Sequence, residues 1–204
     1  MSNARPRLVL ASGSRFRRQM LEAAGLAFDV VTADVDEAAL RAQFAEEAPP
    51  PGPSAVAMRL AEEKARHVAR LQPHALVIGA DQVLALDGVI YAKPADIAAA
   101  RSHLQILRGR RHELPTAAVI VRDGQVLWRG IEIPALTMRR LSDPELEAYL
   151  ERMGDAVTET VGAYKLEGLG ATLMERIEGD YFSIIGLPLL ALLAALRDLG
   201  AARL

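Results

Sequence analysis

The sequence predicts an α/β or α+β protein built on a mixed β-sheet that is long and strongly bent. Apolar strand-like runs alternate with segments of helical periodicity along the whole chain. Two Asp-Gly pairs each separate two strand-like runs, which is the spacing of a tight hairpin. No solenoid or heptad repeat interrupts the pattern. At 204 residues the chain is long enough to bury one sizeable core, or two lobes around a cleft.

Composition excludes several classes of protein. The chain has no cysteine, so it has no disulfides. Its 24 basic and 26 acidic residues give a net charge of −2, and only 4% of residues are aromatic, which disfavours nucleic-acid and membrane-surface binding. The longest apolar stretch, 184–196, is interrupted by Gly186 and Pro188 and is too short to cross a bilayer. The polar N-terminus does not resemble a signal peptide, so we expect a cytoplasmic protein.

The N-terminal half predicts strands joined by two helices. A short apolar run ending in small polar residues predicts a strand, and helical spacing followed by Gly25 predicts the helix after it. The sequence EEAPPPGP cannot hold a regular element and predicts a stiff, exposed loop. The expected elements are a strand at 7–12, a helix at 15–24, a strand at 28–32, the loop at 46–53, a helix from a Ser54 cap to Leu71, and a strand at 75–79.

The C-terminal half predicts two hairpins and three helices. The hairpins turn at Asp87-Gly88 and Asp123-Gly124, and the second joins long strand-like segments at 112–122 and 125–141. Ser142 and Glu145 form a capping-box pattern. The helices are expected at 95–107, about 143–153 and about 189–199, with two further strands at 172–177 and 181–185.

A first candidate site is the segment Ser12-Gly13-Ser14-Arg15-Phe16-Arg17-Arg18. Hydroxyls, free N–H groups at a helix start and guanidinium groups together can hold phosphate oxygens. Three arginines at a helix start oppose the helix dipole unless an anion compensates them. The alternative is a solvated basic face with Ser14 as an ordinary cap.

Carboxylates form a second candidate. Asp36-Glu37 follow one predicted strand and Asp81 follows another, at the edge where α/β sheets usually bind ligands. Together they could hold Mg²⁺ or Mn²⁺, or deprotonate a water molecule. A lone Asp after a strand is otherwise a turn former.

Lysines and glycines supply further candidates. Only three lysines occur, at positions 64, 93 and 165, so Lys64 in the middle of a helix and Lys93 before Pro94 stand out, although the excess of arginine could simply reflect genome composition. The glycine-spaced segment 162–170 could press against a ligand or could form ordinary turns. No Walker loop, GxSxG elbow or metal-ligand spacing of histidines is present.

In combination and order, LVLASGSRFRRQMLEAAG, DVDE, the Lys64 helix, VIGADQVLALDGVIYAKP and VGAYKLEGLGATLMERIEGDYFSIIGLPL resemble the Maf family of nucleoside triphosphate pyrophosphatases. The resemblance covers nearly the whole chain, so residues 1–204 are expected to form a single Maf-like domain. It implies two lobes around a deep cleft, similar to the inosine triphosphate pyrophosphatases. It also implies hydrolysis between the α and β phosphates with a divalent cation, Mg or Mn, in proteins that are often homodimers.

The resemblance also implies residue roles. Asp81 matches the proton acceptor, and Glu37 matches an acidic position that would hold the metal, with Asp81 sharing it. Phosphate-handling positions match Ser12, Ser14, Arg17, Lys64 and Lys93. Base selection would rest on Phe16, Gln82 and Glu167, which are similar to the branch acting on 7-methyl-GTP, although that branch more often carries Trp at position 16.

Chemistry agrees with this substrate, because N7-methylated guanine is cationic: an aromatic face can stack on it and a carboxylate can pair with its N1–H and N2–H edge. UTP, CTP or dTTP would be alternative substrates. From another class of function, the chain could be a nucleotide-binding regulator of cell division without turnover, but a binder would not need a base such as Asp81.

Overall fold

The fold is described from a computed structural model, which covers residues 6–202. Two five-stranded sheets form the framework, with the strand orders β2-β1-β3-β7-β8 and β10-β9-β6-β4-β5. The strands are β1 (Leu8–Leu10), β2 (Asp29–Val30), β3 (Leu76–Gln82), β4 (Leu84–Leu86), β5 (Val89–Tyr91), β6 (Arg111–Glu113), β7 (Thr116–Arg122), β8 (Gln125–Glu132), β9 (Ala135–Met138) and β10 (Met174–Glu178). The α-helices are α1 (Arg15–Ala23), α2 (Glu37–Ala45), α3 (Pro53–Leu71), α4 (Ile97–Leu107), α5 (Asp143–Met153), α6 (Tyr181–Ile184) and α7 (Leu189–Asp198), and the 3₁₀ helices are η1 (Gly154–Thr158), η2 (Val161–Ala163) and η3 (Leu169–Leu173).

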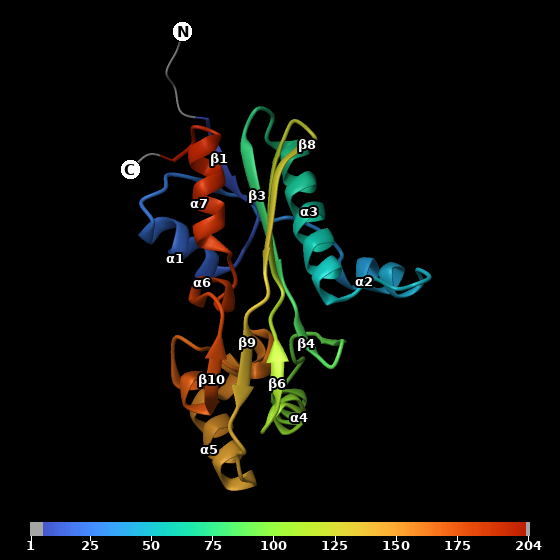
Figure 1. The fold of residues 1–204 in the computed structure, drawn as a ribbon, viewed down its shortest axis with the longest axis vertical. Coiled ribbons are helices and arrows are strands. Elements are labelled where there is room, and N and C mark those ends of the chain that lie inside the picture. Colours follow the sequence, from blue (N-terminus) through green and yellow to red (C-terminus); the bar gives the residue numbers. More distant parts are fainter. Residues whose placement is uncertain (1–5, 203–204) are drawn as a thin grey trace.

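The first sheet is mixed and is covered on both faces. Strands β2, β1 and β3 run parallel, β7 is antiparallel to β3, and β8 is antiparallel to β7. Helices α1 and α7 lie on one face and α3 lies on the other (Figure 1). Because side chains alternate along a strand, Leu8 and Leu10 pack toward α1 and α7 while Val9 packs toward α3.

The same alternation in β3 positions the site. Val77 joins the core under α3, so Gly79 and Asp81, two and four residues later, point to that face. Gly79 has no side chain, and a Cβ atom built there would lie 2.1 Å from the Ala61 carbonyl oxygen and 2.7 Å from the Ala65 nitrogen. The missing side chain therefore lets α3 approach the sheet closely just before Asp81.

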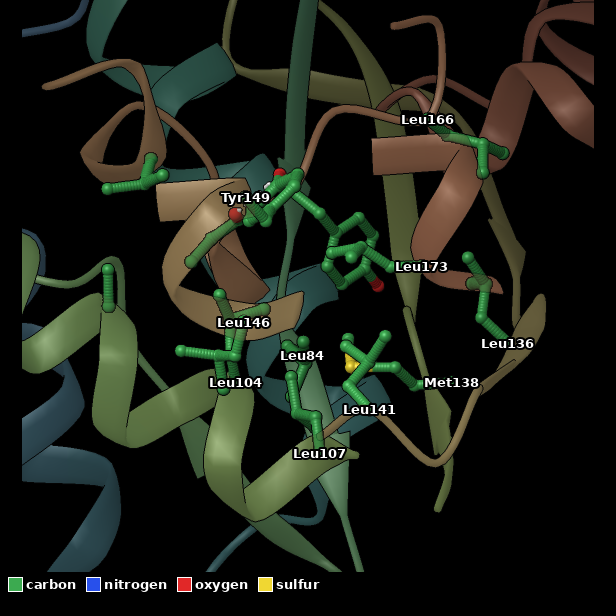
Figure 2. Close-up of a cluster of buried hydrophobic side chains, with 14 of the residues drawn as sticks. Leu84, Leu104, Leu107, Leu136, Met138, Leu141, Leu146, Tyr149, Leu166 and Leu173 are labelled. Atoms are coloured by element: carbon green, nitrogen blue, oxygen red, sulfur yellow. Dashed lines mark hydrogen bonds between the residues drawn. The ribbon is translucent and has the colours of Figure 1, made fainter. Parts of the chain in front are cut away.

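The second sheet is antiparallel and forms the lower lobe in Figure 1, with α4 and α5 packed against it. Its core includes Leu84 from β4, Leu104 from α4, Leu146 and Tyr149 from α5 and Met138 from β9 (Figure 2). A two-lobed α/β fold with mixed strand directions is therefore confirmed.

The two sheets meet where long strands bend. Strand β3 passes into β4 through Val83, and β6 passes into β7 through Leu114 and Pro115. Hydrogen bonds continue across the bend, from Val83 N–H to the Pro115 oxygen at 3.1 Å and from Leu114 N–H to the Pro134 oxygen at 2.9 Å. Proline has no N–H to donate to a ladder, so Pro115 and Pro134 suit the places where the ladder is interrupted. The strand-like segments 112–122 and 125–141 are each divided here.

Several local predictions are confirmed. Both Asp-Gly pairs have positive φ at both residues, 50° and 80° at Asp87 and Gly88, as a type I′ hairpin requires. Ser142 and Glu145 form the complete capping box at the start of α5. Residues 46–52 carry no helix or strand, in agreement with the proline-rich loop.

Other local predictions are wrong. Asp81 lies inside β3 rather than beyond its end, because pairing with β7 extends the strand to Gln82. In place of the strand predicted at 181–185, residues 181–184 form a helical turn, α6, whose cap Asp180 accepts a hydrogen bond from Ser183 N–H. Helix α3 begins at Pro53 with Gly52 as the cap, instead of at Ser54. The helix α2 was not predicted at all.

A buried polar pair fixes the glycine-spaced segment to the lower lobe. His112 Nε2 and the Tyr164 hydroxyl lie 2.6 Å apart, and both residues are buried. Burial lowers the pKa of His112 to about 4, so its imidazole is neutral at pH 7. The Tyr149 hydroxyl donates to the Ala163 carbonyl oxygen at 3.0 Å. These contacts hold the chain in place immediately before Lys165, Leu166 and Glu167.

The close approach of α3 to Gly79 makes a stability prediction. In Gly79→Ala the added methyl group must displace the α3 backbone, so the free energy of unfolding should fall by about 1–3 kcal/mol, as for other overpacked positions. Urea denaturation measures this change. Gly168→Ala is the control, since its Cβ would meet only the Lys165 oxygen, at 3.9 Å. Equal stability of the two variants would contradict the assigned role of Gly79.

Candidate active site

The segment after β1 forms the first wall of the site. The Ser14 hydroxyl caps α1 by accepting a hydrogen bond from Arg17 N–H, and the Ser12 hydroxyl accepts from Ser14 N–H at 3.2 Å. Of the three arginines, only Arg17 is held in the interior of the site. Arg18 pairs with Glu22 on the surface, and the Arg15 guanidinium lies over the Phe16 ring, 5.2 Å from its centre.

Arg17 is tied to three separate segments. Its guanidinium donates to the Ala80 oxygen at 2.8 Å, the Gly186 oxygen at 2.8 Å and the Ser12 hydroxyl at 3.2 Å. Burial lowers the pKa of Arg17, and the negative charges of Asp81 and Glu37 oppose that shift. An arginine held in this way presents a fixed positive charge beside the Ser12–Ser14 loop.

Two carboxylates meet at the ammonium group of Lys64. Its Nζ lies 2.6 Å from Asp81 Oδ1 and 2.7 Å from Glu37 Oε1. Lys64 comes from α3 and Asp81 from β3, and the absent side chain at Gly79 allows these two elements to approach closely. Glu37 is the first residue of α2 rather than the end of a strand, and Asp36 serves only as the cap of that helix.

The electrostatics of the site favour the charged form of Glu37. Burial alone would raise the pKa of Glu37, but the charge and hydrogen bond of Lys64, with the charges of Arg41 and Arg17, outweigh burial and lower it. Asp81 is 4% exposed, and its Oδ2 is buried without a hydrogen-bond partner among the described residues. Arg41 Nη2 is 3.7 Å from that oxygen, too far for a hydrogen bond. Asp81 therefore keeps one oxygen available for a ligand, a metal ion or water.

Three neighbouring cavities share Phe16 in their walls, and the three together are called the groove below. Two have volumes of about 440 and 430 Å³, and a small one of about 40 Å³ lies toward the lower lobe. Ser14, Arg17, Glu37, Lys64 and Lys93 line both large cavities; Ser12 lines one of them, and Asp81 lines the other. Gln82 lines the first large cavity and the small one, and Glu167 lines the small one. The structure thus brings every predicted site residue to one groove.

The small cavity combines an aromatic ring with charged and amide side chains. Phe16 borders it, and Lys165 Nζ lies 5.8 Å from the centre of that ring. Glu167 is exposed at its rim. Gln82 is tethered instead: its Nε2 donates to the Thr116 hydroxyl and to the carbonyl oxygens of Ser183 and Ile184 at 2.8–3.0 Å. Gln82 shapes the cavity wall, and only its Oε1 has no partner in the described structure.

Two charged residues of the groove were missed by the sequence analysis. Arg41 from α2 lies 3.7 Å from both Glu37 Oε2 and Asp81 Oδ2, and Glu159 lines both large cavities while pairing with Lys165 at 2.8 Å. The i,i+4 spacing of Glu37 and Arg41 after the Asp36 cap was a signal for α2 and for this pairing. Glu159 carried no local signal.

Elsewhere, a cavity of about 480 Å³ between α1, β2 and α7 contains none of the predicted site residues. Among residues 6–202 no helix combines the length and apolar character needed to cross a membrane. No group of three or more His, Cys, Asp or Glu residues within that range could hold a metal ion by itself.

Comparison with known proteins identifies a family and several relatives of this chain. Residues 7–199 match the family model described as "Maf-like protein". The chain is 51% identical over 195 residues to a protein of Mesorhizobium japonicum named 7-methyl-GTP pyrophosphatase, a match covering 96% of this chain and 97% of that one. It is 49% identical to a protein of Rhizobium meliloti with the same name, covering 97% and 98% of the two chains.

A protein of Paramagnetospirillum magneticum named nucleoside triphosphate pyrophosphatase is 50% identical, over 94% of this chain and 98% of its own. A family match of this extent, with relatives near 50% identity over nearly full length, leads to one conclusion: the chain belongs to the Maf family.

Proposed function

We propose that the protein hydrolyses a nucleoside triphosphate between the α and β phosphates, releasing a nucleoside monophosphate and pyrophosphate. The observation that carries this proposal is Asp81: a buried carboxylate with one unpartnered oxygen, set in a groove lined by Arg17, Lys64 and Lys93. The names of the relatives support the same reaction class. The enzyme would therefore be a hydrolase acting on acid anhydrides.

In the proposed mechanism, Asp81 orients a water molecule toward the α-phosphorus and takes its proton. The new P–O bond forms at the α-phosphorus as the bond to the bridging oxygen breaks, so negative charge accumulates on the departing pyrophosphate. The fixed charge of Arg17 and the exposed ammonium of Lys93 lie where they can offset that charge. Ser12 and Ser14 would donate hydroxyl hydrogen bonds to phosphate oxygens.

The residues present fit a divalent cation, Mg²⁺ or Mn²⁺. Asp81 and Glu37 already share one cation, the Lys64 ammonium, and Asp81 Oδ2 is an unused buried acceptor. Two carboxylates completed by substrate phosphates and water are a common way to hold Mg²⁺. When bound, the metal would neutralise phosphate charge and polarise the scissile phosphoryl group.

For the base, we propose 7-methylguanine, so 7-methyl-GTP is the substrate. The half-buried ring of Phe16 lies near two cations of the protein, Arg15 and Lys165, and the same attraction would favour stacking of a cationic purine. Glu167 at the rim can pair with the N1–H and N2–H edge.

UTP, CTP and dTTP are the alternative substrates, and a regulator without turnover is the alternative function. A cytoplasmic location and a homodimeric state stay predictions.

Pyrophosphate release from the purified protein tests the reaction and the substrate together. With Mg²⁺ or Mn²⁺, 7-methyl-GTP, GTP, UTP, CTP and dTTP would be compared at one concentration, and we expect selective turnover of 7-methyl-GTP. Turnover of pyrimidine nucleotides would keep the reaction and reject the assigned base pocket. Absence of turnover with every nucleotide would favour the regulator.

Asp81→Asn tests the proposed base. The amide cannot take a proton, so kcat should fall by about 10²–10⁴-fold, while the folded state and nucleotide affinity are largely kept. Steady-state kinetics, nucleotide titration and thermal unfolding measure the three quantities. Asp29→Asn is a matched control, because Asp29 is exposed, lies outside the groove and pairs with Arg7 on the surface. Wild-type turnover by Asp81→Asn would remove Asp81 from the reaction.

Glu167→Gln tests the base pocket. Losing the negative charge should lower kcat/KM for 7-methyl-GTP by about tenfold relative to GTP, because the bond to the cationic base is no longer charge-assisted. The ratio of the two kcat/KM values is the readout. Glu175→Gln, at an exposed position outside the groove, should leave that ratio unchanged. An unchanged ratio in Glu167→Gln would defeat the specificity argument.

A further inference from the structure

Arg41 is a charged residue of the groove that neither the sequence analysis nor the mechanism above uses. It lies in α2, a helix with no buried residue that extends away from the sheets beside the start of α3 (Figure 1). Its side chain nevertheless turns inward, lines the larger cavity with Lys64 and Asp81, and is 28% exposed.

The two contacts of Arg41 are long. Its Nη2 is 3.7 Å from both Glu37 Oε2 and Asp81 Oδ2, whereas Lys64 holds the same two side chains at 2.7 and 2.6 Å. The Arg41 side chain makes no hydrogen bond of normal length within residues 6–202. This contrasts with Arg17, whose guanidinium is used by three partners. Little interaction is lost when the Arg41 side chain turns toward a ligand.

The excess of positive charge in the groove also favours binding of a polyanion. Four cations line the first large cavity, Arg17, Arg41, Lys64 and Lys93, against two carboxylates, Glu37 and Asp81, that belong to the reacting centre. The third carboxylate there, Glu159, is already paired with Lys165. The excess of positive charge suits a triphosphate, and a guanidinium can bind two phosphate oxygens at once.

The position of Arg41 indicates which part of the substrate it would meet. It lines the cavity that contains Asp81, but not the small cavity of Phe16 and Glu167 where the base is placed. With the base in the small cavity and the α-phosphorus at Asp81, as the proposed function has it, the β and γ phosphates would extend past Asp81, away from the base. We propose that Arg41 leaves the two carboxylates when substrate binds and contacts the pyrophosphate portion, where charge accumulates as the bond breaks. This inference rests on the proposed function.

Equilibrium binding of inorganic pyrophosphate, in the presence of Mg²⁺, tests the proposal without relying on turnover. Isothermal titration calorimetry of Arg41→Ala should give a pyrophosphate Kd raised by about tenfold or more, with the Kd of guanosine monophosphate changed by less than about twofold. The kcat/KM for the triphosphate should fall by a similar factor to pyrophosphate affinity. Arg41→Lys keeps the positive charge but not the planar guanidinium that can bind two oxygens at once. It should recover part of the lost pyrophosphate affinity.

Arg59→Ala is the matched control, since Arg59 lies nearby on α3, pairs with Glu47, packs on Phe44 and does not line the groove. It should leave both dissociation constants unchanged. An unaltered pyrophosphate Kd in Arg41→Ala, or equal weakening of pyrophosphate and monophosphate, would overturn the proposal, as would a wild-type protein that does not bind pyrophosphate. A wild-type protein that binds pyrophosphate but turns over no nucleotide would instead reject the proposed function alone.

Discussion

The close contact between β3 and α3 at Gly79 is the constraint on which the site depends. Because Gly79 carries no side chain, the α3 backbone lies where a Cβ would be, and Lys64 on that helix reaches Asp81 on the strand at 2.6 Å. The same ammonium also pairs with Glu37, so charged groups from α3, β3 and α2 are in direct contact. A larger residue at position 79 would separate them, which makes a packing feature the origin of the electrostatic centre.

The bend between the two sheets supplies the second half of the site. The regular strand pairing is divided at the bend, but hydrogen bonds from Val83 and Leu114 to the carbonyl oxygens of Pro115 and Pro134 join the upper and lower lobes there. The upper lobe contributes the end of the groove lined by the Ser12–Ser14 loop and Arg17. The lower lobe contributes Lys93 and the segment before Glu167, which the buried His112–Tyr164 pair fixes in place. The groove therefore has one end rich in hydroxyls and cations and another end bordered by Phe16, Gln82 and Glu167.

Charge is distributed unevenly between fixed and free groups in that groove. Arg17 is held by backbone oxygens from β3 and from the turn at Gly186, so its charge is preorganised and costs no rearrangement when an anion binds. Lys93 is exposed, and Arg41 rests on two carboxylates at long distance. This combination of one fixed cation with freer ones on the opposite walls suits a substrate whose charge moves toward the leaving group during reaction.

The sequence by itself determined the local features, because each depends on neighbouring residues: the Asp-Gly hairpins through their positive φ angles, the capping box of α5, and the types of side chain able to handle phosphate. Only the tertiary structure decided how those side chains meet. It placed Asp81 within β3 by pairing that strand with β7, brought Glu37 to Lys64, and added Arg41 and Glu159 to the groove. Distances between segments far apart in the chain are set by long-range packing, which no local pattern encodes.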